Sequence, residues 1–159
     1  MRNISEYTLK KASEHVSYEA WMFFETLELL KKSKDQKTTN ILLDAYSIHC
    51  RNLFDFLYPK NGPRDDDILV TDYIENNKNY NRYKTKKKEL KFIVRKADKQ
   101  VAHLTYSRNK FGKKNKPWPV VDIGNKMHRT LRTFYESMPH KYQKWPNFLA
   151  LKQLLDGLN

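Results

Sequence analysis

Cysteine is nearly absent from this 159-residue chain, in which Cys50 is the single cysteine. One cysteine excludes a disulfide within the chain and argues against a zinc site built from cysteines. The five histidines are scattered, and no two of them have the i,i+4 spacing with a nearby carboxylate that is typical of helical metal sites. No glycine-rich phosphate loop is present either. We therefore expect a protein that works without a metal or another cofactor.

Long apolar runs are also absent. No run approaches the roughly 18 residues of a membrane-spanning helix, and the first residues lack the apolar segment of a signal peptide. These absences predict a cytoplasmic protein with no membrane partner. Only 4 glycines and 6 prolines interrupt the chain, which favours long helices over a fold of strands and turns. At this length we expect one domain, residues 1–159, with one core.

Apolar residues recur at helical spacing and predict an all-α bundle of about five helices with two polar loops. The expected helices cover residues 5–32, about 38–58, 86–107, 120–138 and 147–155. A turn at 59–67 and a short helical segment at 68–75 follow the second helix. The two loops are residues 76–85 and 108–119.

The second predicted helix carries polar residues inside its apolar arc. His49 and Asn52 project into the arc, while Arg51 and Asp55 lie at its edge with the spacing of an i,i+4 pair. A buried Asn or His without a hydrogen-bond partner costs roughly 1–3 kcal/mol. These four residues therefore either satisfy one another and the backbone or line a cleft. The arc itself consists of Ile41, Leu42, Ala45, Ile48, Leu53 and Phe56.

Positive charge is concentrated in the second half of the chain. Residues 1–80 carry a balance of −2 and residues 81–159 a balance of +15, within a net charge of +13. This asymmetry indicates a polyanionic partner, with nucleic acid first; the alternative is a basic surface that has no specific ligand. The 108–119 loop adds aromatic residues to cations, a combination suited to a nucleic-acid backbone and an unstacked base. The alternative is that its aromatics anchor the loop to the domain. The candidate nucleic-acid-binding residues are Lys96, Lys110, Lys113, Lys114, Lys116 and Trp118.

The third predicted helix combines a core stripe with a functional side. On a helical projection, His103 points away from the stripe, on the side shared by Phe92, Lys96 and Lys99. An imidazole among cations can bind a phosphate and move a proton. The alternative is a partly exposed histidine on a basic helix. The expected stripe is Leu90, Ile93, Val94, Ala97, Val101 and Leu104.

The non-core side of the same helix also carries Phe92, Ala102 and Tyr106, which is too apolar for a simple solvated face. We therefore expect a homodimer in which this helix forms the contact between the two copies.

An all-helical domain with an arginine upstream of a histidine near the end of a long helix resembles the HEPN superfamily. The segments DKQVAHLTYSR and IHCRNLFDFLYP are similar to those of small bacterial HEPN-like proteins, and the likeness covers roughly residues 15–140. The resemblance implies a dimer cleft and, in active members, metal-independent ribonuclease chemistry. It also implies toxin or abortive-infection biology, with an antitoxin or defence-system partner. Other members of the superfamily are non-catalytic binding modules.

The sequence thus predicts an RNA-associated protein with metal-independent endoribonuclease activity; the alternative is a non-catalytic interaction or RNA-binding module. In the catalytic scheme, neutral His103 accepts the proton of the RNA 2′-hydroxyl while a cation stabilises the charged phosphate. Seven residues separate Arg95 from His103, whereas Lys99 lies four residues before it and Arg108 five residues after it. All three cations remain candidates for the phosphate contact.

Overall fold

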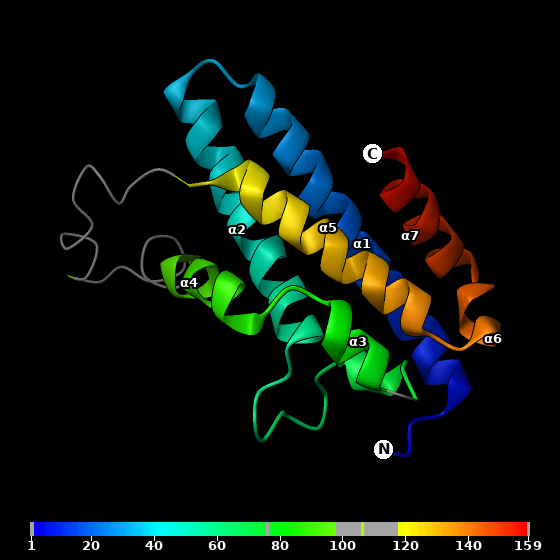
Figure 1. Ribbon diagram of the computed structural model, residues 1–159. Helices are drawn as coiled ribbons and strands as arrows, with labels where there is room; N and C mark the ends of the chain where they lie inside the picture. Colours follow the sequence, from blue (N-terminus) through cyan, green and yellow to red (C-terminus); the bar gives the residue numbers. More distant parts are fainter. Residues whose placement is uncertain (1, 76, 98–105, 107–117, 159) are drawn as a thin grey trace.

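A computed structural model describes residues 2–75, 77–97, 106 and 118–158 (Figure 1). Within these ranges the chain forms seven α-helices, one short 3-10 helix and no strand, so the all-α prediction is confirmed. No helix among them is both long and apolar enough to cross a membrane. The elements are α1 (Glu6–Lys32), α2 (Gln36–Leu57), η1 (Val70–Asp72), α3 (Asn77–Tyr83), α4 (Lys87–Ala97), α5 (Val120–Ser137), α6 (His140–Gln143) and α7 (Pro146–Gly157).

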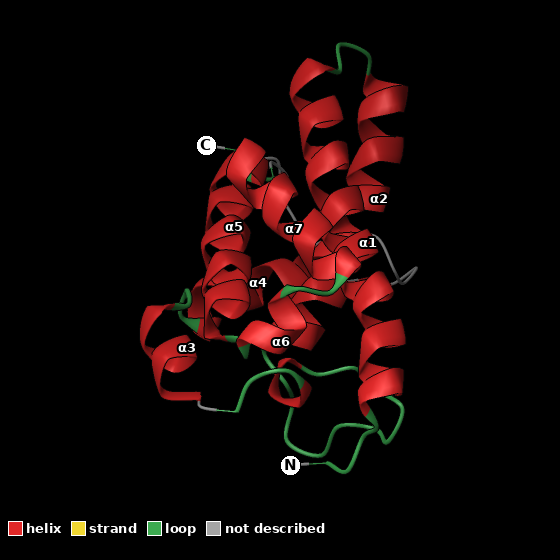
Figure 2. Cartoon of the chain, turned by 90° about the vertical axis from the view of Figure 1, so that its right-hand side faces the viewer, coloured by secondary structure: helices red, strands yellow, loops and turns green. Residues whose placement is uncertain are grey.

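The two longest helices, α1 and α2, form an antiparallel hairpin that organises the bundle. Helices α5 and α7 pack against α1, α4 packs against α2, and α3 packs against α5. The end of the hairpin near its connecting turn extends beyond the other helices (Figure 2). Asp35 begins α2 as its N-cap, because its carboxylate accepts a hydrogen bond from the Thr38 backbone nitrogen at 2.9 Å. The helix therefore starts two residues before the expected position.

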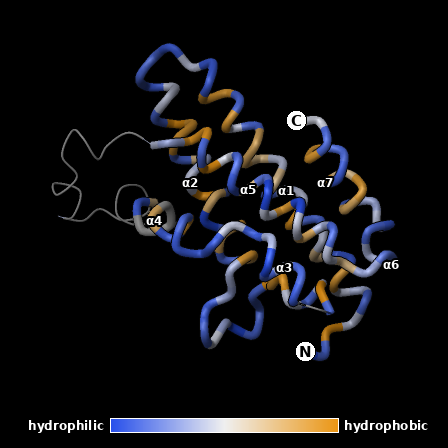
Figure 3. The backbone as a smooth tube through the Cα atoms, in the orientation of Figure 1, coloured by the Kyte–Doolittle hydropathy of each residue, from blue (hydrophilic) through white to orange (hydrophobic). Residues whose placement is uncertain are grey.

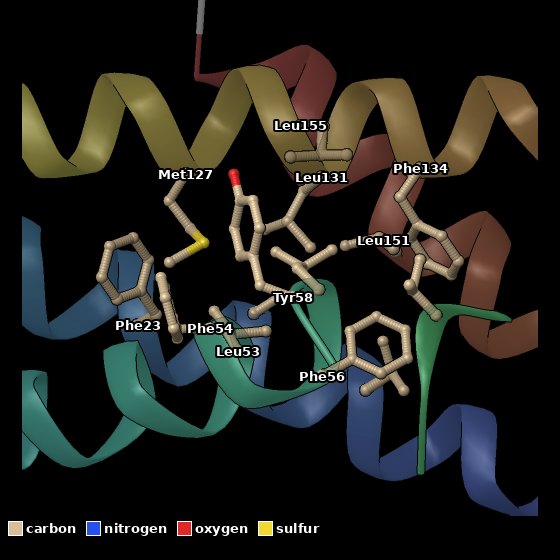
Figure 4. Packing of buried hydrophobic residues seen from close by; sticks show 14 of the residues in the cluster. Phe23, Leu53, Phe54, Phe56, Tyr58, Met127, Leu131, Phe134, Leu151 and Leu155 are labelled. Atoms are coloured by element: carbon tan, nitrogen blue, oxygen red, sulfur yellow. The ribbon is translucent and has the colours of Figure 1, made fainter. Parts of the chain in front are cut away.

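The core lies where α1, α2, α5 and α7 meet (Figure 4). The helix expected at 120–138 buries apolar residues at helical spacing, which include Met127, Leu131 and Phe134. The Phe134 ring meets Phe56 of α2 edge-on, with ring centroids 5.1 Å apart. Edge-to-face contacts of this kind add about 0.5–1.5 kcal/mol beyond the area that the rings bury.

Chain segments far apart in sequence close this core. Ser17 in α1 donates a hydrogen bond to the Asn147 carbonyl at 2.7 Å, and the Asn147 side-chain amide donates to Ser13 Oγ at 3.0 Å. Ser13 is fully buried, so its hydroxyl needs such a partner. The start of α7 is thereby fixed to the first half of α1.

The apolar arc predicted for α2 is confirmed at Leu53 and Phe56, which are buried, and wrong earlier in the helix. Ile41 and Ile48 are exposed, and Asn52 is exposed as well rather than enclosed in the arc. The buried face instead includes Tyr46 and Cys50, and the Tyr46 hydroxyl donates to the Val120 carbonyl at 2.9 Å. That hydrogen bond satisfies the hydroxyl, so a tyrosine can occupy a fully buried position that the projection assigned to other residues.

The connection between α2 and α4 differs from the expected turn, short helix and loop. Only residues 70–72 of the expected 68–75 segment are helical, as the 3-10 helix η1. The polar segment predicted as a loop at 76–85 contains α3 instead, because Tyr80 is buried and its hydroxyl donates to the Leu57 carbonyl at 2.7 Å. Helix α6 was not predicted. Together with α3 it raises the number of helices above the expected five.

Helix α4 agrees with the predicted stripe at Leu90 and Ala97, which are both buried. The side chains of Ile93 and Val94, and residues 98–105 of the expected helix, lie outside the described part of the chain.

Candidate nucleic-acid interface and polar pocket

The predicted catalytic residues His103, Lys99 and Arg108 lie outside the residues that the structure describes. The same holds for the side chain of Arg95, although its backbone belongs to α4. Four of the predicted nucleic-acid-binding residues are also outside: Lys110, Lys113, Lys114 and Lys116. Their roles therefore remain predictions from sequence.

Lys96 and Trp118 are described, and they contact each other. The Lys96 ammonium lies 5.0 Å from the centroid of the Trp118 ring, and Lys96 is only 7% exposed. Burial lowers the pKa of Lys96, because a low-dielectric environment disfavours the charged form. Trp118 in turn packs against the hydrophobic core. Lys96 is thus largely buried and Trp118 is partly buried against the core, which agrees with the alternative interpretation that an aromatic residue of this region packs on the domain.

A dense set of cations lies on α3, on the first half of α4 and on the residues that join them. We call this set the basic face. Six of its seven members are exposed and Lys84 is half-buried, and the interval 78–91 contains a single carboxylate, that of Glu89. The tube of α3, α4 and their connection is coloured mostly hydrophilic (Figure 3). The basic face consists of Lys78, Arg82, Lys84, Lys86, Lys87, Lys88 and Lys91.

Lys84 shows that positive charge is crowded at this face. Its pKa is lowered, first by burial and then by the charge of Lys87. The Lys84 ammonium lies 4.4 Å from the centroid of the Tyr80 ring and 5.1 Å from that of Tyr58. These cation–π contacts hold Lys84 at the base of the face.

An exposed aromatic ring accompanies these cations. Tyr83 is 57% exposed, and the guanidinium carbon of Arg82 lies 5.3 Å from its ring centroid. Lys87 donates to the carbonyls of Tyr58 and Pro59 at 3.2 and 3.3 Å, which joins the start of α4 to the end of α2. The face thus presents cations for phosphates beside a ring on which a base can stack.

A second feature is a polar pocket of about 590 Å³ between α1, α2 and the segment that follows α2. Its apolar lining comes from core residues that include Val16, Leu53, Phe56 and Leu69. Its polar lining includes three of the four residues of the predicted second-helix cluster, namely Arg51, Asn52 and Asp55. The sequence left two alternatives for this cluster: its members pair with one another, or they line a cleft. Both hold in part, because Arg51 and Asp55 form a pair and also line the pocket.

Several of the polar groups around the pocket are paired. Arg51 Nε lies 4.0 Å from Asp55 Oδ2, which is the expected i,i+4 pair, and Lys60 Nζ lies 3.1 Å from Asp55 Oδ1. His49 does not line the pocket, but its Nδ1 is 2.7 Å from Oε2 of Glu19, which does. The half-buried His49 thereby finds its partner on α1.

Five polar lining residues were missed by sequence reasoning: His15, Glu19, Lys60, Arg64 and Asp67. Those on α1 lie thirty or more positions from the cluster on α2, so helical spacing gave no signal for them. The charged run after Pro59 was interpreted only as a turn and a helix start. Its one informative feature is Gly62, whose φ of 70° requires a residue that tolerates left-handed backbone.

Arg2 fixes the pocket segment from outside. Its Nε donates to Asp72 Oδ1 at 3.1 Å and its Nη1 donates to the Asp65 carbonyl at 3.2 Å. The side-chain hydrogen bond with Asp72 raises the pKa of Arg2. Asp72 Oδ2 also accepts from the Leu69 backbone nitrogen at 2.9 Å. The N-terminal residues thus hold the segment in the position that forms one wall of the pocket.

Among the residues placed by the structure, no three His, Cys, Asp or Glu side chains are grouped closely enough to hold a metal ion. The chain matches no protein-family model, no curated protein and no solved structure. Its class is therefore defined by its architecture, which is an all-helical bundle with a basic face on α3 and α4 and a polar pocket between α1 and α2.

Proposed function

We propose that this chain is a cytoplasmic RNA-binding protein of HEPN-like type and that its basic face binds single-stranded RNA. The observation that supports this most is the set of six exposed cations with a single carboxylate in the interval, together with the exposed ring of Tyr83, which Arg82 contacts. Cations supply the salt-dependent attraction to phosphates. An exposed ring adds base stacking that does not depend strongly on sequence.

The proposal includes metal-independent cleavage by residues that follow α4 in sequence. His103 accepts the proton of the 2′-hydroxyl, the 2′ oxygen attacks phosphorus, and the bond to the 5′ oxygen breaks. The leaving oxygen takes a proton from water. Arg95, Lys99 or Arg108 stabilises the negative charge that develops on the phosphate.

A homodimer is part of the same proposal. Phe92 on α4 is 44% exposed, and Tyr106, which lies beyond the described part of this helix, is 93% exposed. Exposed large apolar side chains are typical of contact surfaces. Toxin or abortive-infection biology, with an antitoxin or defence-system partner, follows only from the HEPN resemblance.

A non-catalytic module is the second candidate. It is favoured by the burial of Lys96 against Trp118, which assigns two of the residues expected at the nucleic acid to the domain interior. Such a module keeps the basic face for binding and lacks the cleavage step.

The test uses two triple variants with the same change in net charge. Lys86, Lys88 and Lys91 are replaced by Ala on the basic face, and Lys10, Lys32 and Lys34 are replaced by Ala on α1 and the turn after it. All six lysines are exposed, and each variant has a net charge three lower than +13. Binding of a fluorescent single-stranded RNA is followed by polarisation at several salt concentrations.

In the basic-face variant, the slope of log K for RNA binding against log salt concentration should become shallower by about two, since each lost phosphate contact removes roughly 0.7 from its magnitude. The α1 variant should keep most of the slope. Circular dichroism confirms folding, because exposed substitutions change stability by under about 0.5 kcal/mol. If the two variants lose the same amount of the salt slope, RNA binding depends only on the total charge of the protein, and the basic face is not the binding site.

A further inference from the structure

We propose that the polar pocket between α1 and α2 binds a nucleoside monophosphate unit, with its phosphate near His15 and Arg64 and its base against the apolar lining. The unit can be a free nucleotide or the 5′-phosphorylated end of an RNA. This site is separate from the basic face and does not depend on RNA binding there.

The size and the lining of the pocket fit a small organic molecule. Its volume of about 590 Å³ lies within the range of roughly 300–1,000 Å³ that is usual for ligand sites. Val16, Leu53 and Phe56 form an apolar wall, and all three belong to the buried core, so the wall is held rigidly. A flat heterocycle can pack on such a wall, whereas a bare inorganic ion would leave it uncovered.

The charges favour an anion over a cation. Each lining carboxylate already has a donor or a cation beside it: Glu19 Oε2 lies 2.7 Å from His49 Nδ1, and Asp67 accepts from the Arg64 backbone nitrogen at 2.9 Å. Asp55 Oδ1 accepts no hydrogen bond from the described residues, but it forms an ion pair with Lys60 Nζ at 3.1 Å. The guanidinium of Arg64 and the imidazole of His15 have no hydrogen-bond or ion-pair partner in the part of the chain that is described. The pocket therefore has two donor groups without a partner among the described residues, Arg64 and His15, whereas each of its carboxylates has a donor or a cation beside it.

The side chains of Arg64 and His15, which have no partner within the described ranges, are suited to bind a phosphate. A guanidinium binds a phosphate through two parallel hydrogen bonds, which gives orientation as well as affinity. His15 adds a ring nitrogen that can donate a further hydrogen bond. Asn52 also lines the pocket, and its exposed amide offers both a donor and an acceptor to the edge of a base.

Isothermal titration calorimetry of the full chain with AMP, adenosine and inorganic phosphate tests the assignment. AMP should bind at one site per chain. Adenosine and phosphate should each bind at least about tenfold more weakly, because each lacks one half of the recognised unit. Arg64→Gln should weaken AMP binding about tenfold. Arg64 is exposed, so the variant should fold normally.

Lys34→Gln is the matched control. It lies beyond the end of α1, and the stretch from Glu19 to Lys32 alone spans about 20 Å at the helical rise of 1.5 Å per residue. AMP binding should be unchanged in this variant. A short RNA with and without a 5′-phosphate then identifies the source of the ligand: a preference for the phosphorylated end assigns the pocket to RNA ends, and binding of AMP alone assigns it to free nucleotides.

Three results would overturn the proposal. These are the absence of saturable AMP binding, unchanged AMP affinity in Arg64→Gln, and loss of AMP binding in the Lys86, Lys88 and Lys91 variant in place of Arg64→Gln. Failure of the RNA-binding proposal is distinguishable, because it appears in the salt dependence of RNA without a 5′-phosphate and leaves AMP binding intact.

Discussion

Replacement of Gly124 by alanine measures how closely α5 approaches α1. A Cβ atom at this position would lie 2.5 Å from Leu27 Cδ2, well inside van der Waals contact. Leu27 is buried, so its side chain has little room to move away. Overpacking of this kind costs about 1–3 kcal/mol, while alanine gains about 1 kcal/mol over glycine within a helix. We expect a net loss of about 1 kcal/mol, or roughly 2–4 °C in Tm for a chain of this length.

The sign should reverse when the clash is removed. Leu27→Ala alone should destabilise the protein by about 2–5 kcal/mol, because it leaves a cavity in the core. In that background Gly124→Ala should stabilise by about 1 kcal/mol through helix propensity. The difference between the two backgrounds is the coupling free energy of a double-mutant cycle, which neighbouring residues show at about 0.5–3 kcal/mol.

Urea denaturation followed by circular dichroism gives all four free energies of unfolding. Gly157→Ala serves as the control, because a Cβ there meets no atom within 4 Å, and it should stabilise by no more than about 1 kcal/mol. If Gly124→Ala changes stability by the same amount with Leu27 and with Ala at position 27, the close approach of the two helices does not control packing here.

Two further predictions concern cleavage and assembly. His103→Ala should abolish RNA cleavage while RNA binding and the helical dichroism persist. Cleavage by the wild-type protein should persist in EDTA and yield 2′,3′-cyclic phosphate ends. If His103→Ala cleaves as fast as the wild type, the catalytic scheme is wrong. Between Lys99→Ala and Arg108→Ala, the variant with the lower cleavage rate identifies the residue that contacts the phosphate. Light scattering at high micromolar concentration should show a dimer that Phe92→Glu dissociates and that Leu149→Glu, an equally exposed apolar position on α7, does not. A wild-type monomer at that concentration would contradict the dimer.

Helical periodicity predicted those helices whose buried face is made of aliphatic and aromatic residues in regular order. α5 is the clearest case, since Ile123, Met127 and Leu131 are all buried as expected. Periodicity failed in α2, where Tyr46 and Cys50 are buried and two isoleucines are exposed. The burial of Tyr46 depends on a carbonyl 74 positions away, and no local pattern contains that information.

The short helices and the pocket were missed for related reasons. α3 has one buried anchor, Tyr80, in an otherwise polar segment, and its stability comes from packing on α5. In the pocket, sequence reasoning found the residues that share α2, because an i,i+4 pair is a local feature. It could not find Glu19 or Arg64, since those reach the same space only after α1, α2 and the segment beyond Pro59 are packed together.

The attachment of α7 to α1 has a consequence for how the chain acquires its structure during synthesis. Ser13 and the Asn147 amide that bonds to it are 134 positions apart. At roughly 5–20 residues per second, a ribosome needs between about 7 and 27 s to make Asn147 after Ser13. Throughout that time the side of α1 that α7 will cover has no partner, so the nascent chain depends on the α1–α2 hairpin to limit its exposed apolar surface. The many long-range contacts of the bundle should also make it fold more slowly than a helical protein whose neighbours in space are neighbours in sequence.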